Sequence, residues 1–456
     1  AKNTGEKIGR KEGHKKDKLE RIPDEKINGY DIFFYEGDKY EGEFNKDQIH
    51  GKGIMTWKNG NKYEGEFKNN FFDGEGKLEF ASHSNYVGQF VEGMQTGKGV
   101  FTYSNGDKFD GQWKNGLKEG NGVYLYHNGD QYEGQWKNDF KEGKGAFYYN
   151  TGDRYDGEYK NDLMDGKGVY TFASGSRYEG DWKYGVKEGK GIYYYKDGGR
   201  YEGDFKDDQR HGVGIYYYKN GNKFEGEFKN GKSNGFGRYI ALDGSTYKGN
   251  WLNDKQNGNG NLIYPDGSFY VGNFKEGKKC GNGRFVFSDK NMYEGNFEDN
   301  EISGEGAFYW KDGRVYVGNW KNNKMNGYGI FIWPDKKKYY GNYINNLKEG
   351  FGSFHWNDGH KYEGFWKGGK QHGYGLINGS KGDKYGYWIE GKLENKVNDD
   401  ETIFFINQKI NEAKKNKEYY LFQLKREKYE KMINDASSSY DTNFNSKEAK
   451  NNENYG

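Results

Sequence analysis

The chain has few of the residues on which several common protein classes depend. Of its 456 residues, only three are proline and one, Cys280, is cysteine. A single cysteine forms no internal disulfide, which favours a reducing compartment. The charged N-terminus lacks an apolar signal-peptide core, and no run of 18 apolar residues occurs. We therefore expect a cytoplasmic or cytoskeletal protein.

Aliphatic residues are also scarce. Hydrophobic residues make up 32% of the chain and aromatic residues 19%, so a core of Leu, Ile and Val is not available. Tyr, Phe and Trp bury large areas per residue and are the expected core. The 71 basic and 69 acidic residues leave a net charge of +2. This balance predicts no general attraction to nucleic acid or to membranes.

What the sequence has in abundance is a repeat with a period of 23 residues. An aromatic-x-Gly-x-aromatic unit begins at Tyr40, Gly42 and Phe44 and recurs fifteen times without insertion or deletion. Seven residues after each closing aromatic comes Gly-x-Gly, first as Gly51 and Gly53. A fixed period predicts one continuous array rather than the three ordinary domains that the length suggests. These five positions are the expected structural residues.

Each repeat has the pattern of a β-hairpin. In the second copy, two aromatic-rich runs flank Asn59-Gly60, a strong turn signal. We expect an odd connection that sets Trp57 opposite Tyr63 and Met55 opposite Gly65. This register gathers the large side chains on one face, whereas a slip of one residue would divide them between two faces.

The same register gives the glycines their expected roles. Gly53 lies opposite Phe67, so Gly53 and Gly65 are gaps that receive large neighbouring side chains. Gly51 comes just before the strand and is expected to serve the sharp turn between repeats.

Stacked hairpins predict an all-β, elongated antiparallel β-meander with about 4.8 Å per strand, or on the order of 150 Å for fifteen repeats. We expect the array over residues 30–391, with partial units at both ends. Residues 1–29 are polar and Lys-rich, as in a flexible arm. Residues 392–434 are expected to hold a linker and an amphipathic α-helix from about Thr402 to Ile433, and residues 435–456 to be disordered.

Two interpretations of that helix stay open. Its apolar residues recur at a helical spacing, for example at Ile403, Ile406 and Ile410. Such a stripe must bury itself against something. It either folds back on the C-terminal end of the array or docks on a partner.

The repeat unit resembles a known family. Units such as Tyr-Glu-Gly-Glu-Phe-Lys-Asn, followed by His-Gly-x-Gly and an Asn/Asp-Gly turn, are similar to MORN repeats over residues 30–390. The resemblance implies a β-meander used in scaffolding, as in ciliary radial-spoke-head proteins, protist cytoskeletal proteins, junctophilins and plant phosphoinositide kinases. From the sequence we expect neither a kinase domain nor a C-terminal membrane anchor. We therefore expect a component of the ciliary axoneme, with other axonemal or cytoskeletal proteins as partners.

The face opposite the aromatics carries the best candidate site. In the early repeats its charges alternate, as in Lys39, Glu41 and Glu43; from the tenth repeat on, the same positions become amide or apolar. A contiguous exposed apolar surface marks an interaction site, although sequence drift on the sheet is an alternative. The predicted docking residues are Phe269, Val271, Met292, Val315, Val317, Tyr328, Tyr340, Phe351 and Tyr374.

A row of lysines supports an alternative function. Lysines such as Lys68, Lys114 and Lys137 follow the closing aromatic. They suit a peripheral membrane or phosphoinositide-binding module that links membrane and cytoskeleton. Because acidic residues interleave with them, we expect only weak contact with anionic lipid. The open sheet edges also permit self-pairing, so a homodimer is a further alternative.

No catalytic, cofactor or metal site is expected. His50, His211 and His372 share one repeat position and lack the clustered Cys/His partners of a zinc site. The Gly-x-Gly units lack the Gly-Lys-Ser/Thr of a nucleotide-binding loop, and Cys280 has no paired base nearby in sequence. The chain is therefore expected to be a structural scaffold and not an enzyme.

Overall fold

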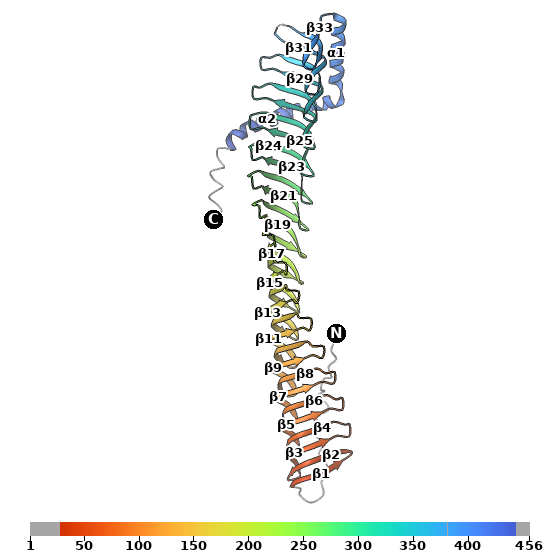
Figure 1. Cartoon of the computed structure of the whole chain (residues 1–456), viewed down its shortest axis with the longest axis vertical. Coiled ribbons are helices and arrows are strands. Elements are labelled where there is room, and N and C mark those ends of the chain that lie inside the picture. The colour runs from red at the N-terminus through yellow and green to blue at the C-terminus, as the bar shows by residue number, and fades with distance from the viewer. Residues whose placement is uncertain (1–27, 381, 444–456) are drawn as a thin grey trace. The chain divides into compact units, whose positions relative to one another are not determined.

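The computed structural model describes residues 28–380 and 382–443, with side chains up to Asn434. The fold is all-β, as the sequence predicts: 33 strands form an open antiparallel meander, and two helices follow them. Figure 1 shows the strands succeeding one another in chain order. The chain divides into two compact units between Lys219 and Asn220.

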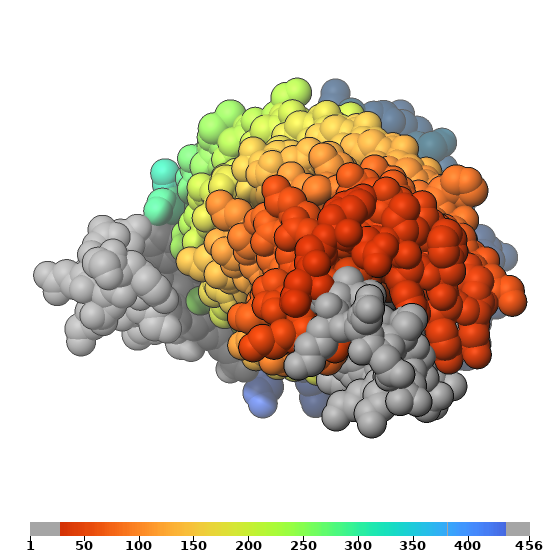
Figure 2. Space-filling model, turned by 90° about the horizontal axis from the view of Figure 1, so that it is seen from below, coloured from red at the N-terminus to blue at the C-terminus, as the bar shows by residue number. Residues whose placement is uncertain are grey.

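The first unit contains seventeen strands, each paired antiparallel with its neighbours in sequence. They are β1 (Gly29–Tyr35), β2 (Asp38–Asn45), β3 (Gln48–Thr56), β4 (Lys62–Lys68), β5 (Phe71–Glu79), β6 (Asn85–Val91), β7 (Met94–Thr102), β8 (Lys108–Lys114), β9 (Leu117–Leu125), β10 (Gln131–Lys137), β11 (Phe140–Tyr148), β12 (Arg154–Lys160), β13 (Leu163–Thr171), β14 (Arg177–Lys183), β15 (Val186–Tyr194), β16 (Arg200–Lys206) and β17 (Gln209–Tyr217). Figure 2 views this unit from the end at which the first strands, in red, lie.

The second unit continues the meander and adds the helices. Its elements are β18 (Lys223–Lys229), β19 (Lys232–Ile240), β20 (Thr246–Leu252), β21 (Lys255–Ile263), β22 (Phe269–Lys275), β23 (Lys278–Val286), β24 (Met292–Glu298), β25 (Glu301–Tyr309), β26 (Val315–Lys321), β27 (Lys324–Ile332), β28 (Lys338–Ile344), β29 (Leu347–His355), β30 (Lys361–Lys367), β31 (Lys370–Asn378), β32 (Lys384–Ile389), β33 (Lys392–Val397), α1 (Asp400–Lys415) and α2 (Lys417–Asn443).

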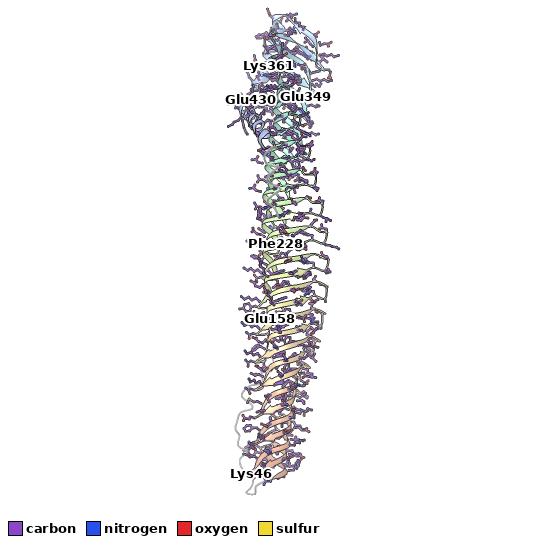
Figure 3. The ribbon with its side chains drawn as sticks, turned by 90° about the vertical axis from the view of Figure 1, so that its left-hand side faces the viewer. Lys46, Glu158, Phe228, Glu349, Lys361 and Glu430 are labelled. Atoms are coloured by element: carbon purple, nitrogen blue, oxygen red, sulfur yellow. The ribbon has the colours of Figure 1, made fainter. Side chains whose placement is uncertain are left out.

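The sheet has two chemically different faces, and side chains project from both (Figure 3). The tyrosine face carries the conserved spacing of buried rings that begins with Tyr40 and Tyr63. The charged face carries the residues between them, such as Glu41 and Glu64. Successive residues of a strand point to opposite faces. Because every repeat has the same length, each repeat position stays on the same face throughout the sheet.

The predicted register is wrong by two residues. Met55, not Trp57, lies opposite Tyr63, and Gly53 lies opposite Gly65. Trp57 instead begins a five-residue loop, in which its backbone N–H donates to the carbonyl of Asn61 at 2.9 Å. The preceding strand thus contributes two more residues to the loop than expected. A shift of two leaves every side chain on its expected face, so the aromatic face is preserved.

Glycine faces glycine because a tyrosine ring lies across both residues. Tyr63 is 0% exposed, and its hydroxyl donates to the carbonyl of Glu66 at 2.9 Å. A Cβ on Gly65 would lie 2.5 Å from the Tyr63 hydroxyl, and one on Gly76 would lie 2.6 Å from the Tyr63 ring. The glycines are therefore gaps for a large side chain, as expected, but for the ring of their own hairpin. Tyr40, Gly42 and Gly53 form the first such unit, and Phe44 packs edge-on against Tyr40.

Gly51 does not serve the turn between repeats. It lies inside β3 at a β-bulge, with φ +73° and the Glu43 side chain against it. This left-handed conformation is the reason for glycine there. The turn is made by Lys46 and Asp47, whose φ values of 52° and 67° are those of a type I′ turn.

The C-terminal segment differs from the prediction in two places. Residues 392–397 form β33 rather than a linker, and the single expected helix is two helices that meet at Asn416, whose ψ of 134° is extended. Asp399 caps the first helix, since its side chain accepts a hydrogen bond from the Thr402 N–H at 2.8 Å. Helix α2 continues to Asn443, into the segment expected to be disordered. Residues 1–27 and 444–456 of the predicted arm and tail lie outside the described residues.

Candidate docking site on the charged face

Helices α1 and α2 pack on the charged face of the second unit. In Figure 1, α1 runs beside the last strands of the meander, and α2 turns towards β24 and β25. Strand and helix side chains bury one another in a shared apolar cluster. We call this the helix-binding face; its buried residues are Ala307, Tyr309, Val317, Ile330, Tyr340, Phe351 and Leu376 from the strands, and Ile406, Ile410, Tyr419, Phe422, Tyr429 and Ile433 from the helices.

Aromatic rings make the centre of this contact. Phe422 of α2 stacks on Tyr328 with ring centroids 5.5 Å apart, and Tyr419 meets Phe351 edge-on at 5.3 Å. On α1, Phe405 meets Tyr374 edge-on at 5.3 Å. Such pairs add to the stabilisation that buried area provides.

Charged groups anchor α2 at the margin of the cluster. Glu305 pairs with Lys425 and, at 3.3 Å, with Lys428. Burial raises the pKa of the Glu305 carboxyl, but the two lysines outweigh burial and hold the pKa below its ordinary value. Nearby, the Tyr340 hydroxyl donates to Glu430 at 3.1 Å, and the Arg426 guanidinium lies 4.2 Å from the Tyr340 ring centroid.

Helix α1 is anchored through Glu363 of β30. This carboxylate pairs at once with Lys361 of its own strand at 3.0 Å and with Lys414 of α1 at 3.1 Å. A carboxylate that is already paired within the sheet thus accepts a second cation from a helix.

The structure brings eight of the nine predicted docking residues to this site. Val317, Tyr340 and Phe351 are buried in the cluster, and four more pack against it: Met292, Val315, Tyr328 and Tyr374. Val271 lines an adjoining hollow of ≈640 Å³ together with Tyr429 and Met432. Within the described part of the chain, Phe269 belongs neither to the apolar cluster nor to the hollow. Of the two interpretations of the helix left open by the sequence, the structure has the helix folded back on its own array.

Sequence analysis assigned no role to His355, which lies on this face. Its ring shares a hydrogen bond of 2.8 Å with the Ser353 hydroxyl and lies 4.9 Å from the Tyr340 ring centroid. Burial, helped by the nearby cations Lys361 and Arg426, lowers the pKa of His355 to about 4. The lack of any repeat of this histidine left no periodic signal to find it.

Aromatic boxes around lysine were missed as well. The Lys348 ammonium lies between 4.6 and 5.1 Å from the ring centroids of Trp333, Tyr339, Phe354 and Trp366 on the tyrosine face. Burial lowers the pKa of Lys348 to about 8. The signal was available: lysine recurs at this repeat position among aromatics, as in Lys118 and Lys141. Cation–π attraction makes its role structural.

The remaining candidates from the sequence are metal ligands and the lysine row. In the part of the chain that the structure describes, no group of three or more His, Cys, Asp or Glu side chains could hold a metal ion. None of the described helices is long and apolar enough to cross a membrane. The lysines Lys68, Lys114 and Lys137 end their strands and are exposed. Acidic groups pair with other lysines at the same ends of strands, as in Lys370 with Glu390 at 2.7 Å.

Comparison with known families agrees with this geometry. The model of the MORN repeat matches fifteen consecutive segments, from residues 40–62 to residues 362–384. The chain belongs to the MORN-repeat family. The matches cover most of the sheet, and MORN-repeat arrays of this kind are typically non-catalytic scaffolds or membrane-binding modules.

Comparison with individual proteins adds less. No curated protein matches this MORN-repeat chain. The TCP10 domain of CPAP from Danio rerio is 12% identical, with 51% of this chain and 99% of that chain covered and a TM-score of 0.25. The SAS-4 (dCPAP) TCP domain of Drosophila melanogaster, solved with a proline-rich motif of Ana2, is 18% identical, with 39% and 85% covered and a TM-score of 0.19. A streptogramin B lyase is 12% identical, with 63% and 88% covered and a TM-score of 0.12. Scores this low carry no argument about function.

Proposed function

We propose that this MORN-repeat protein is a non-enzymatic scaffold that docks other proteins on the charged face of its β-meander. The observation that carries the proposal is the helix-binding face, where the sheet already holds two helices. Side chains such as Phe422, which is 3% exposed, each contribute about 1.5–3 kcal/mol when buried. Paired carboxylates such as Glu363 add a second contact with a helix.

We further propose that the assembly is cytoskeletal, with the ciliary axoneme as the first candidate and axonemal proteins as partners. Support comes from family membership together with the resemblance of a free-standing array to radial-spoke-head proteins. The experiment is to express the tagged full chain in a ciliated cell, extract the membranes with detergent and image what remains. The proposal predicts that the chain stays on the axoneme. Release of the chain with the detergent-soluble fraction would contradict it, and the tag alone is the control.

A membrane or phosphoinositide-binding module is the second candidate function. The exposed lysines at the strand ends favour it, because such lysines attract anionic headgroups. Neighbouring ion pairs oppose it, such as Lys370 with Glu390, because they reduce the net positive charge of that surface. The two functions therefore differ in the strength and salt dependence of lipid binding.

Self-association is a further proposal about partners. Among the described residues, the edge strand β1 pairs with β2, and it exposes Tyr30, Ile32 and Phe34 on the charged face. An unprotected edge of this kind can pair with the same edge of a second copy. Sedimentation velocity over a range of concentrations measures whether a dimer forms.

A further inference from the structure

The helix-binding face has a counterpart seven repeats earlier, over which neither of the described helices lies. Adding 161 residues, or seven periods of 23, converts each position of β11–β17 into the equivalent position of β25–β31. The same central row of the charged face is apolar in the first stretch and, apart from Ser353, in the second. It consists of Ala146, Val169, Ile192 and Ile215 in the first, and of Ala307, Ile330, Ser353 and Leu376 in the second.

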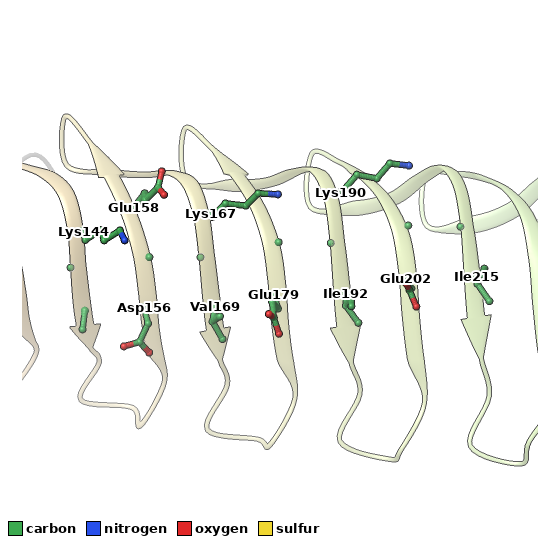
Figure 4. Close-up of a pocket in the computed structure, with 18 of the residues that line it drawn as sticks. Lys144, Asp156, Glu158, Lys167, Val169, Glu179, Lys190, Ile192, Glu202 and Ile215 are labelled. Atoms are coloured by element: carbon green, nitrogen blue, oxygen red, sulfur yellow. The ribbon is translucent and has the colours of Figure 1, made fainter.

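The first stretch forms a groove of ≈1050 Å³ on the charged face of β11–β17. Figure 4 shows its central row, in which Val169 and Ile192 alternate with Glu179 and the other carboxylates from strand to strand. In a second row, nearer one end of the strands, lysines such as Lys167 and Lys190 alternate with carboxylates such as Glu158. We call this the lysine-rimmed groove. It combines an apolar strip with a carboxylate on each intervening strand.

The helix-binding face shows how such a carboxylate meets a helix. Glu202 of the groove occupies the repeat position of Glu363, and Arg200 occupies that of Lys361. Glu202 lies 3.6 Å from Arg200 and its side chain is 48% exposed. Because Glu363 holds Lys361 and a helix lysine together, Glu202 has the same capacity for a second cation.

We propose that the lysine-rimmed groove binds an amphipathic helix of a partner protein, with basic residues on one flank and acidic residues on the other. This inference rests on the proposed scaffold function and names the partner's chemistry. The basic flank pairs with the carboxylates of the central row, such as Glu202. The acidic flank meets the lysine row, in which Lys190 has a side chain that is 71% exposed.

The spacing of the groove suits a helix that lies across the strands. The apolar residues of the central row lie on every second strand, or about 9.6 Å apart. Seven residues of an α-helix rise about 10.5 Å, so one apolar residue in each heptad meets each apolar residue of the row. Helix α2 lies across its strands in this way, since Tyr419 meets Phe351 of β29 and the Tyr309 hydroxyl of β25 donates to the Met432 carbonyl at 3.5 Å.

A partner helix fits the groove better than the helices of a second copy. In the helix-binding face, Phe422 and Tyr419 rest on Tyr328 and Phe351. The equivalent groove positions are Lys167 and Lys190. A second copy of α2 would therefore lose the ring–ring contacts that Tyr328 and Phe351 provide, and the ammonium groups in their place are exposed and already paired with carboxylates. A helix that fits this groove needs aliphatic residues facing the central row and acidic residues facing the lysine row.

The test uses the full chain and a labelled synthetic helix of three heptads. The peptide carries leucine on one stripe, lysine on one flank and glutamate on the other, and fluorescence anisotropy measures its binding. We expect saturable binding that V169D with I192D weakens by about tenfold or more. The matched control is I54D, because Ile54 occupies the same repeat position outside the groove. A milder variant is I192S, which introduces the residue that the helix-binding face has at the equivalent position, Ser353. We expect it to reduce the affinity for the peptide without adding a charge to the sheet.

A charge exchange gives the second arm of the test. The variant E202K is expected to weaken binding of this peptide and to restore binding of a peptide whose lysine flank is replaced by glutamate. The proposal is overturned if the wild-type chain shows no saturable binding at about 1 mM peptide, if I54D loses as much affinity as the groove variants, or if both peptides bind E202K equally. Groove substitutions that abolish a dimer in sedimentation velocity would assign the groove to a second copy and overturn it too. If the chain stays on the axoneme but its groove binds no helix, this inference is refuted and the proposed scaffold function is unaffected.

Discussion

At the scale of single residues, each tyrosine ring and the glycine pair beneath it depend on one another. Tyr155 lies across Gly157 and Gly168, and its hydroxyl donates to the Glu158 carbonyl at 3.1 Å. The ring fills the space that two Cβ atoms would occupy, and the glycines let two strands approach beneath it. Burial of the ring compensates for the flexibility that glycine brings to a strand.

The substitution G168A tests this packing. A Cβ at Gly168 would lie 2.5–2.6 Å from ring carbons of Tyr155, so the ring must leave its position. We expect the local opening free energy of β12 and β13 to fall by about 1–3 kcal/mol, the usual effect of overpacking. Hydrogen exchange measured strand by strand gives this value directly.

The control for G168A is G199S. A Cβ at Gly199 has its nearest neighbour at 3.3 Å, and the repeat has serine at the same position in Ser176, whose hydroxyl accepts the Lys196 N–H at 3.2 Å. We therefore expect unchanged or slightly increased protection. An equal loss in both variants would show that the sheet is sensitive to any added side chain and not to the ring–glycine contact.

His355 predicts an acid-sensitive step in the second unit. Burial lowers its pKa to about 4 from an ordinary value of 6.5, so the folded state binds fewer protons than the unfolded state between these values. The histidine contribution to stability is therefore complete above pH 6.5 and is lost as the pH falls towards 4. Hydrogen exchange of β28 and β29 is expected to show this loss.

The variant H355N separates this histidine from other titrating groups, because Asn378 occupies the same repeat position. In H355N the decrease in hydrogen-exchange protection of β28 and β29 between pH 6.5 and pH 4 should be smaller than in the wild type. Identical pH profiles for the two proteins would mean that His355 is not held neutral beneath α2.

At the scale of the elements, the docked helices depend on a few buried rings. Phe422 is 3% exposed and stacks on Tyr328, so F422A is expected to cost about 3–5 kcal/mol of docking free energy. Amides of α1 and α2 should then exchange faster, while β1–β17 keep their protection. The control is L424A, because Leu424 on the same helix is 63% exposed. Equal acceleration in both variants would contradict the packing of α2 on the helix-binding face.

The sequence determined the hairpins well and their register less well. The Asn59-Gly60 signal marks a real turn, and alternation places Tyr63, Gly65 and Phe67 on one face. The pattern does not count loop residues, however, and registers that differ by two satisfy the same alternation. The type I′ turn at Lys46 and Asp47 was also missed. The repeats did contain a signal for it, because the same turn is Asn115-Gly116 and Asn230-Gly231 in other copies, with positive φ at both residues.

At the scale of the whole molecule, the period predicts the array because each repeat needs only its neighbours for burial. The candidate site was predictable in part: loss of charge from the charged face identified residues such as Val317 and Phe351. The surface on which the helices pack was not predictable, because periodicity within a helix identifies its apolar stripe but not the surface that covers this stripe. The lysine-rimmed groove was missed because its apolar row is interrupted on every intervening strand by a carboxylate such as Glu179.

The most direct test of the central claim, that this chain acts by docking proteins and not by binding membranes, is flotation of the full-length protein with anionic vesicles. At physiological salt we predict that the protein stays at the bottom of the gradient or floats weakly, and that added salt removes the weak binding, because acidic residues interleave with its lysines. Tight flotation that depends on one headgroup and persists at high salt would contradict the account.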